Sequence, residues 1–254
     1  MSWLPTDCHA HSRHSDGMLT VAQVVERARH LGVRPSVSDH ISNDAPTSVD
    51  SLPTIEAYLD DLERFEVLRG GEFCWHDPLW RTLPEALVRR FTHRLGSLHA
   101  IRLPDGRFYR AFHAEPPEGM TPAQYMEAHV ASLEALAAEM PVDILSHPTL
   151  VPTSLRELDA HELWTETLEE RSVTALRTAG IAFEVSTRYV AHERLVRRMA
   201  EGGVRIALGS DGHTREQVAD IATPLATARR LGVADGALYD PAVHGSRTGF
   251  WPTL

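Results

Sequence analysis

DCHAHS, residues 7–12, decides the fold together with GSDGH, residues 209–213, near the other end of the chain. Each stretch follows a short run that is typical of a β-strand, and each carries two side chains of metal-binding type two residues apart. In an extended strand this spacing puts both side chains, such as His9 and His11, on the same face. One such pair is weak evidence, but the same arrangement after strand upon strand is typical of a metal centre.

Nine side chains of this type recur along the chain, most of them directly after a predicted strand: His9, His11, Asp16, His40, Glu72, His99, His147, Asp211 and His213. The carboxyl ends of the strands of an α/β barrel meet at one mouth, so we expect these side chains to converge there. Nine ligands exceed the four that one zinc ion takes, which predicts two or three divalent ions with a carboxylate such as Glu72 as a bridge. Mixed imidazole and carboxylate ligands suit Zn, Mn or Fe and argue against a soft thiolate site.

Strands and helices alternate, which predicts an α/β domain with a mainly parallel sheet. After a first short strand ending at Asp7-Cys8-His9, we expect strands over 33–38, 66–69, 95–101, 142–145, 181–185 and 204–208. We expect helices over 20–31, 54–65, 84–94, 122–139, 161–179 and 215–231. Pro224 predicts a kink or a break in the last helix, and LPDGRFYRAF, residues 103–112, predicts a loop or small hairpin. These are seven strand–helix units in a single domain, residues 1–254.

Composition narrows the class of protein. The chain has 254 residues and is 43% hydrophobic, which suffices for one well-buried domain. Its formal net charge of −10 argues against long nucleic acid as a partner, because such binding depends on contacts from basic side chains to phosphates. Two cysteines give no disulfide framework, and no apolar stretch approaches the ~20 residues of a membrane span. We therefore expect a cytoplasmic protein without membrane association, and its oligomeric state stays open.

The motifs DCHAHS, GGE, GSLHA, LSHP and GSDGH, in this order, resemble those of the PHP (polymerase and histidinol phosphatase) metal-dependent phosphoesterases over nearly the whole chain. The resemblance implies a distorted (β/α)7 barrel with three metal ions. It assigns one ion to His9, His11, Glu72 and Asp211, a second to Glu72, His99 and His147, and a third to Asp16, His40 and His213. Glu72, Asp211 and His213 are the expected catalytic residues, and Asp211 or a histidine of the site is expected to manage the proton passed to the leaving alcohol.

Within that family, GSLHAI, VDILSHPTLV and IALGSDGHTREQVADI look most like histidinol-phosphate phosphatase, which predicts hydrolysis of L-histidinol phosphate to L-histidinol. Three positions depart from the pattern. The branch often has a histidine where this chain has Asp16, and it usually has an alanine in place of Gly212 and an asparagine in place of Ser186. Asp16 is closer to the polymerase-associated and exonuclease-like branches. The alternative is therefore a nucleotide phosphatase or a 5′–3′ exonuclease-like phosphodiesterase acting on short oligonucleotides or nucleoside bisphosphates.

A small phosphorylated substrate needs a cationic partner, and Arg binds phosphate in a bidentate fashion. Arg188, just after a predicted strand, is the best candidate, and Arg102, Arg107 and Arg110 are second choices. Glu184 either contacts a substrate amine or serves as a structural acceptor. Trp75, His76 and Trp80 form one wall of the pocket or pack on the barrel, and Cys74 is expected to be an inert buried thiol.

Two other classes of protein compete with a phosphoesterase. A catalytically idle metal-binding or regulatory module would bind ions without turnover, but all nine ligand positions hold competent side chains. An amidohydrolase also uses an early pair of histidines, but such a site gives no role to Glu72 and the chain lacks an evident bridging lysine.

Overall fold

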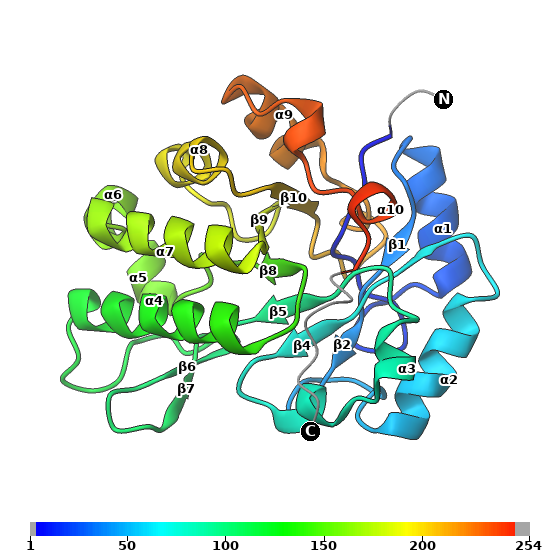
Figure 1. The fold of residues 1–254 in the computed structure, drawn as a ribbon, viewed down its shortest axis with the longest axis horizontal. Helices are drawn as coiled ribbons and strands as arrows, with labels where there is room; N and C mark the ends of the chain where they lie inside the picture. Colours follow the sequence, from blue (N-terminus) through cyan, green and yellow to red (C-terminus); the bar gives the residue numbers. More distant parts are fainter. Residues whose placement is uncertain (1–3, 247–254) are drawn as a thin grey trace.

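The computed structural model describes residues 4–246, in which a parallel sheet is surrounded by helices (Figure 1). The strand order is β10-β9-β8-β5-β4-β2. These strands are β2 (His40–Ile41), β4 (Glu72–Cys74), β5 (Leu95–Ser97), β8 (Ile144–Ser146), β9 (Ala182–Ser186) and β10 (Ile206–Gly209). A further parallel pair, β1 (Ser36–Val37) and β3 (Leu68–Arg69), lies just ahead of β2 and β4 along the chain.

The N-terminal segment, residues 6–11, joins the two ends of this sheet. On one side the Cys8 N–H donates to the Leu208 carbonyl over 2.8 Å, next to β10. On the other side the Ser38 N–H donates to the Ala10 carbonyl over 2.8 Å, between β1 and β2. The segment thus supplies one more strand position between β10 and the start of the sheet, as expected for a distorted (β/α)7 barrel.

The interior of the barrel is filled in layers. A small apolar cluster lies at one level and consists of Cys8, Leu95, Ile144, Ala182, Ala207 and Tyr239. Side chains two residues apart on a strand point the same way, so the next level toward the carboxyl ends contains Ser97, Ser146, Glu184 and Gly209. The larger apolar cluster includes the alternate strand side chains, such as Phe73 and Phe183, together with the buried faces of the helices. The barrel is therefore a packed core, and the chemistry is confined to its carboxyl end.

The longer helices cover the outside of the barrel (Figure 1). They are α1 (Val21–His30), α2 (Leu52–Leu62), α4 (Pro122–Glu139), α7 (Glu166–Ala179), α8 (Glu193–Glu201) and α9 (Ala222–Arg230). Shorter helical pieces are η1 (Pro78–Thr82), α3 (Glu85–Val88), α5 (Thr153–Arg156), α6 (Ala160–Leu163), η2 (Asp235–Ala237) and α10 (Pro241–His244). Thr20 and Thr121 begin α1 and α4 with capping boxes, and Gly180 ends α7 with a φ of 67°.

Two predicted helices are shorter than expected. The helix predicted over 84–94 is only α3, because the Thr92 N–H donates to the Arg69 carbonyl over 2.7 Å and draws the chain back to the sheet. The helix predicted over 215–231 begins at Ala222 as α9. Pro224 lacks an N–H and is tolerated only in the first turn, so the break that it predicted is the start of the helix.

Other boundaries also shift. The strand predicted over 95–101 ends as β5 at Ser97, and the chain continues as β6 (Ala100–Arg102), which pairs with β7 (Phe108–Arg110) in the hairpin that the turn signal predicted. The helix predicted over 161–179 is divided into α6 and α7, because the Thr165 hydroxyl accepts from Leu168 N–H and caps α7. His40 lies within β2 rather than after the preceding strand.

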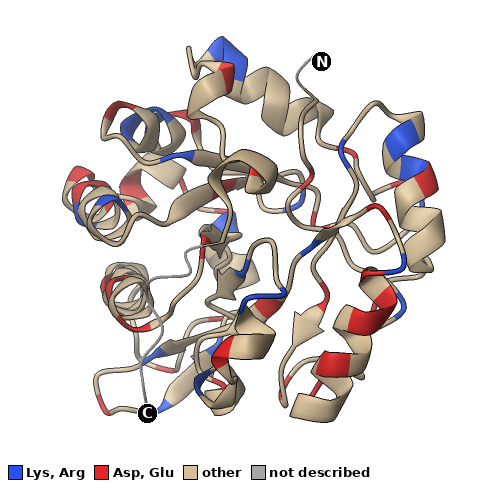
Figure 2. Cartoon of the chain, turned by 45° about the vertical axis from the view of Figure 1, so that its right-hand side comes forward, with Lys and Arg blue, Asp and Glu red and all other residues tan. Residues whose placement is uncertain are grey.

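Charged residues lie mainly on the outer helices and loops, where basic and acidic positions are interspersed (Figure 2). The α2 helix contributes three carboxylates, Glu56, Asp60 and Asp61, and no basic residue. Among residues 4–246, no helix is both long enough and apolar enough to cross a membrane.

We expect His129→Gln to reduce the loss of stability at acid pH. Burial lowers the pKa of His129 from 6.5 to about 4, although its bond to the Pro148 carbonyl, 2.9 Å away, opposes this. Below pH 6.5 the unfolded chain therefore binds a proton that the folded chain does not. The His129 ring therefore leaves the free energy of unfolding unchanged above that pH and lowers it by up to about 3 kcal/mol as the pH falls to 4.

Glutamine can keep the hydrogen bond to the Pro148 carbonyl without titrating. Urea unfolding of both proteins across this pH range measures the difference. His30→Gln, at an exposed position of α1, is the control. If the stability of His129→Gln fell as steeply with decreasing pH as that of the parent protein, the prediction would be contradicted.

Candidate metal centre

All nine predicted ligands meet at the carboxyl end of the barrel. Their ligand atoms fall into groups in which every atom lies within 4.8 Å of the others. The groups share members, so they form one continuous centre rather than separate sites. Most of the side chains are buried, and Asp16 and His213 stand at the more open side.

The first donor set consists of His9, His11, Glu72 and Asp211. The Nε2 atoms of His9 and His11 lie 3.1 Å apart, and Asp211 Oδ1 lies 3.2 Å from His11 Nε2. Glu72 Oε2 lies 3.4 Å from His9 Nε2 and 3.7 Å from His11 Nε2. Ligand atoms about 2.0–2.1 Å from a tetrahedral zinc ion stand roughly 3.3 Å from one another. The measured pairs of this set are spaced like ligands of one ion, and the ligand atoms of His9, His11 and Asp211 all lie within 4.8 Å of one another.

The second donor set consists of Glu72, His99 and His147. Glu72 Oε1 lies 3.3 Å from His99 Nε2 and 2.8 Å from His147 Nε2, and the two Nε2 atoms are 3.3 Å apart. The two oxygens of Glu72 thus face different sets, which is the geometry of a bridging carboxylate.

The third donor set consists of Asp16, His40 and His213. Asp16 Oδ1 lies 3.2 Å from His213 Nε2 and 3.7 Å from His40 Nε2. Asp16, where the sequence departs from the histidinol-phosphatase branch, thus lies beside both rings of this set.

The residues present fit divalent cations. Glu72 Oε2 is fully buried and has no hydrogen-bond partner, although imidazoles surround it. The Nε2 atoms of His9 and His11 lie 3.1 Å apart, and a hydrogen bond from one ring to the other leaves the adjacent Glu72 Oε2 without a donor. Buried polar atoms without partners are costly, and a cation among the donor atoms satisfies all of them at once.

The electrostatics point the same way. Burial alone would raise the pKa of Glu72, but the imidazoles of His40, His9 and His99 hold it well below its usual range. Burial would lower the pKa of His40, but Glu72 and Asp16 raise it to about 10. The carboxylates therefore draw a proton onto His40, whereas burial lowers the pKa of His99 to about 4. Metal ions would displace the proton of His40 on binding.

Two of the ligands occupy unusual backbone positions. His147 has a φ of 30° and Asp211 a φ of 48°, in the left-handed region that costs a residue other than glycine of order 1–3 kcal/mol. Each sits directly beyond a strand, where the turn swings its side chain into the mouth of the barrel. The Asp211 turn is held by its N–H, which donates to the His9 carbonyl over 2.8 Å. Such strain kept at a ligand is typical of a functional site.

Glu184 lies beneath the ligands and does not line the cavity. Its Oε1 is 2.9 Å from His9 Nδ1, and its Oε2 accepts from the His147 N–H. The residue is 1% exposed, so its position argues against the substrate contact that the sequence suggested and for the structural role. A Cβ at position 209 would lie 1.8 Å from Glu184 Oε1, which explains the glycine there.

Several supporting residues were not predicted. Ser97 and Ser146 donate to Glu72 Oε1. Asp39 accepts from the Ser12 N–H and hydroxyl, both over 2.7 Å, and so holds the loop after His11. Asp7 similarly accepts from the backbone and hydroxyl of Ser210, over 2.8 and 2.6 Å. Both aspartates stand one or two residues before a ligand histidine, which is the only sequence signal that could have singled them out.

A cavity of about 350 Å³ opens above the three donor sets. Its walls beyond the ligands are Asp44, Ala45, Pro46, Arg110, Phe112, Arg188 and Tyr189. Arg188 Nη1 lies 3.2 Å from His213 Nδ1 and 3.5 Å from Asp211 Oδ2, so the predicted phosphate contact does reach the site.

The second-choice arginines differ. Arg110 lines the cavity and pairs with Asp44. Arg107 pairs with Asp105 over 2.7 Å, and Arg102 lies over the Trp75 ring, so neither reaches the cavity walls.

The expected aromatic wall comes from other residues. Trp75 and Trp80 belong to the apolar core, and neither they nor His76 line the cavity. Phe112 and Tyr189 take that place, with ring centroids 5.2 Å from His99 and 5.5 Å from His147.

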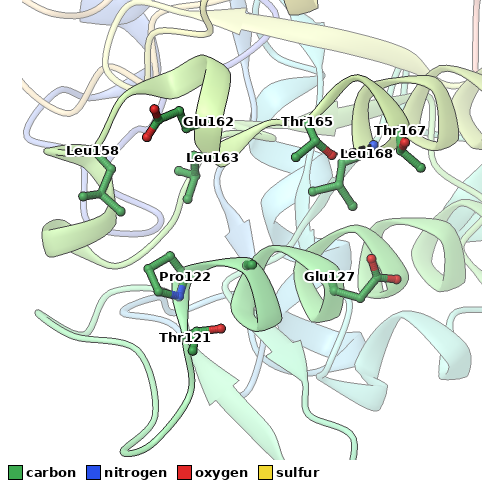
Figure 3. Close-up of a pocket in the computed structure, with 10 residues that line it drawn as sticks. Thr121, Pro122, Glu127, Leu158, Glu162, Leu163, Thr165, Thr167 and Leu168 are labelled. Carbon is green, nitrogen blue, oxygen red and sulfur yellow. Dashed lines mark hydrogen bonds between the residues drawn. The ribbon is translucent and has the colours of Figure 1, made fainter.

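A second hollow, of about 500 Å³, lies between the start of α4 and the α6–α7 segment (Figure 3). Its lining includes Leu158, Leu163 and Leu168 with Glu127 and Glu162, but no histidine and no basic residue. It shares no residue with the metal centre and offers no group suited to phosphate chemistry.

We expect Gly209→Ala to lose the ion of the first donor set. The new Cβ would displace Glu184 from His9 and leave that ring without its anchor. Metal content per chain after dialysis measures the effect. Gly236→Ala is the matched control, since nothing lies within 4 Å of a Cβ there. Equal metal content in the two variants would contradict the assigned role of Glu184.

Comparisons with known proteins bear on the fold. No family model and no curated protein matches the sequence. The structure is similar to that of histidinol phosphate phosphatase from Lactococcus lactis subsp. lactis, solved with zinc, L-histidinol and phosphate, with a TM-score of 0.67 and 16% identity over 94% of this chain and 95% of that chain.

Two weaker likenesses carry no argument. One is to a chain in archaeal ribonuclease P with mature tRNA, with a TM-score of 0.45 and 11% identity over 91% of this chain and 89% of that chain. The other is to a two-domain protein from Bacteroides vulgatus that contains a predicted PHP-like metal-dependent phosphoesterase, with a TM-score of 0.39 and 16% identity over 84% and 53% of the two chains. The chain shares its fold with the histidinol phosphate phosphatase, and this fold is the α/β barrel expected from the sequence.

Proposed function

We propose that this chain is a metal-dependent phosphomonoesterase that acts on a small phosphorylated metabolite, with L-histidinol phosphate as the first candidate. The observation that carries the proposal is the convergence of nine metal-binding side chains in overlapping groups, two of which contain Glu72, beneath one cavity that Arg188 lines. Nine ligands arranged in this way suit several divalent ions, of which zinc, manganese and iron match the mixture of imidazole and carboxylate.

Divalent ions in such a site supply a nucleophile from water at neutral pH and stabilise charge on the phosphoryl oxygens. The chain's own residues would orient the ester. Arg188 offers a planar fork of donors for two phosphate oxygens beside the third donor set. Asp211 and His213 flank that guanidinium, where either could pass a proton to the leaving alcohol. Glu72 would hold the first two ions at a fixed separation.

The size and lining of the cavity favour a small leaving group. A cavity of about 350 Å³ suits one small phosphate ester rather than a polynucleotide. Phe112 and Tyr189 offer ring faces or edges, and Asp44 offers a carboxylate near the mouth. A leaving group with a flat ring and an amine, as in L-histidinol, matches this lining. The Lactococcus protein of the same fold was solved with L-histidinol and phosphate, which supports the choice of candidate.

Nucleotide phosphatase or phosphodiesterase activity on short oligonucleotides or nucleoside bisphosphates is the second candidate. It is favoured by Asp16, which supplies the carboxylate of the third donor set, and by Arg110, a second arginine on the wall of the same cavity. Arg110 already pairs with Asp44, which makes it less available to a second phosphate. Both cysteines are free thiols, which supports the proposal of a reducing, cytoplasmic location.

Phosphate release from L-histidinol phosphate tests the proposal. The panel beside it contains mononucleotides and nucleoside bisphosphates, measured by the same phosphate release, and short oligonucleotides, measured by the mononucleotides set free, because cleavage of a phosphodiester releases no inorganic phosphate. Each is supplied with Mn, Zn or Fe, and chelator is the control. Chelator-sensitive turnover of L-histidinol phosphate above the rest is the expected result. Preference for a nucleotide would select the second candidate, and metal binding without turnover of any ester would leave an idle metal-binding module.

We expect Arg188→Ala to lower kcat/KM for the preferred ester by about 10- to 100-fold, the loss of charge-assisted hydrogen bonds worth roughly 1.5–3 kcal/mol. Metal content should not change, because Arg188 belongs to no donor set. Arg107→Ala, which breaks only an exposed pair with Asp105, is the control. Unchanged kcat/KM in Arg188→Ala would remove this arginine from the site.

A further inference from the structure

We propose that Cys74 is a positioning residue for the second donor set, and that this set holds its ion less firmly than the first donor set does. The proposal rests on the metal centre of the proposed function. It concerns the atoms behind the ligands, which differ between two sets that share Glu72.

The thiol of Cys74 meets the rear of the His99 ring. Cys74 Sγ lies 3.0 Å from His99 Nδ1, and the two residues are 1% and 5% exposed. His99 Nε2 faces the other way, toward Glu72 and His147. A histidine that binds through Nε2 carries its proton on Nδ1 and donates it to an outer partner, which fixes the ring orientation. For His99 that partner is a sulfur atom.

Strand geometry builds this contact. Cys74 follows Glu72 by two residues in β4, so both side chains point into the barrel while Phe73 packs outward in the apolar core. The same strand therefore delivers the bridging carboxylate and the thiol that steadies a ring beside it. The expectation of an inert buried thiol captured the burial of Cys74 but not this contact.

The first donor set has a stronger outer partner. His9 Nδ1 lies 2.9 Å from the carboxylate of Glu184, which the His147 N–H also holds. A hydrogen bond to an ionised group is roughly twice as strong as a neutral one, whereas sulfur is a weak acceptor.

The other histidine of the second donor set has less support still, because His147 Nδ1 is buried without a hydrogen-bond partner. Outer partners raise the basicity of a ligand and fix its direction, and their loss typically costs 10- to 100-fold in metal affinity. In the second donor set a thiol supports one ring, and the Nδ1 atom of the other ring has no hydrogen-bond partner. We therefore expect this set to release its ion before the first donor set does.

Cys74→Ala tests the positioning role, and the chain offers a matched control. Cys8, the other buried cysteine, packs in the small apolar cluster, and within residues 4–246 the hydrogen-bond contact of its Sγ is the one to the Thr6 carbonyl, over 4.0 Å. Ion content per chain is measured by mass spectrometry after dialysis against increasing chelator. We expect Cys74→Ala to lose one ion at chelator concentrations about tenfold lower or more, and Cys8→Ala to behave like the parent protein. Cys74→Ser, whose hydroxyl can still accept, should restore part of the retention.

Three results would overturn the proposal. Equal retention in Cys74→Ala and the parent protein would show that the thiol does not support the ion. A sulfur-to-metal charge-transfer band in the cobalt-substituted parent protein, absent from Cys74→Ala, would show that Cys74 is itself a ligand. A parent protein that binds no ions would remove the metal centre, and the proposed function with it. Ion retention that follows the expected order without turnover of any ester would support the Cys74 proposal while the proposed function fails.

Discussion

The buried carboxylate of Glu72 is the interaction on which the rest of the site depends. It has no exposure to solvent, and one oxygen faces His99 and His147 while the other faces His9 and His40. A charge buried in this way costs several kcal/mol unless positive charge and hydrogen bonds surround it. The barrel supplies both, through two serine hydroxyls from the layer below and through imidazoles that either bind protons or share metal ions with the carboxylate.

That requirement explains why the interior of the barrel changes character along its axis. Apolar side chains such as Ile144 fill one level, and two residues later the same strands present Ser146 or Glu184. The polar level lies between the apolar core and the metal-binding side chains, where Glu184 orients the His9 ring and two serine hydroxyls donate to Glu72. Beyond it the strands end in strained turns at His147 and Asp211, which the polar level and the N-terminal segment hold in place.

The convergence of these side chains could be predicted because most of them stand near a strand end, where position alone implies that they meet, whereas Asp16 lies in the turn before α1. The strand ends also revealed the α/β barrel, although hydrogen bonds from Thr92 and the ring of Pro224 moved two helix boundaries in ways that a local pattern does not report. Glu184 and Cys74 could not be assigned from sequence. Each lies within a short strand, and the register of that strand against its neighbours decides which histidine ring its side chain contacts.

Anomalous diffraction from crystals grown with zinc or manganese would locate the ions around Glu72. We expect one ion in each donor set, with the two oxygens of Glu72 on different ions and all three ions below the cavity that Arg188 lines. Three peaks at these positions are the predicted result. A map with no peak among these side chains, or with a single ion held away from Glu72, would contradict the account.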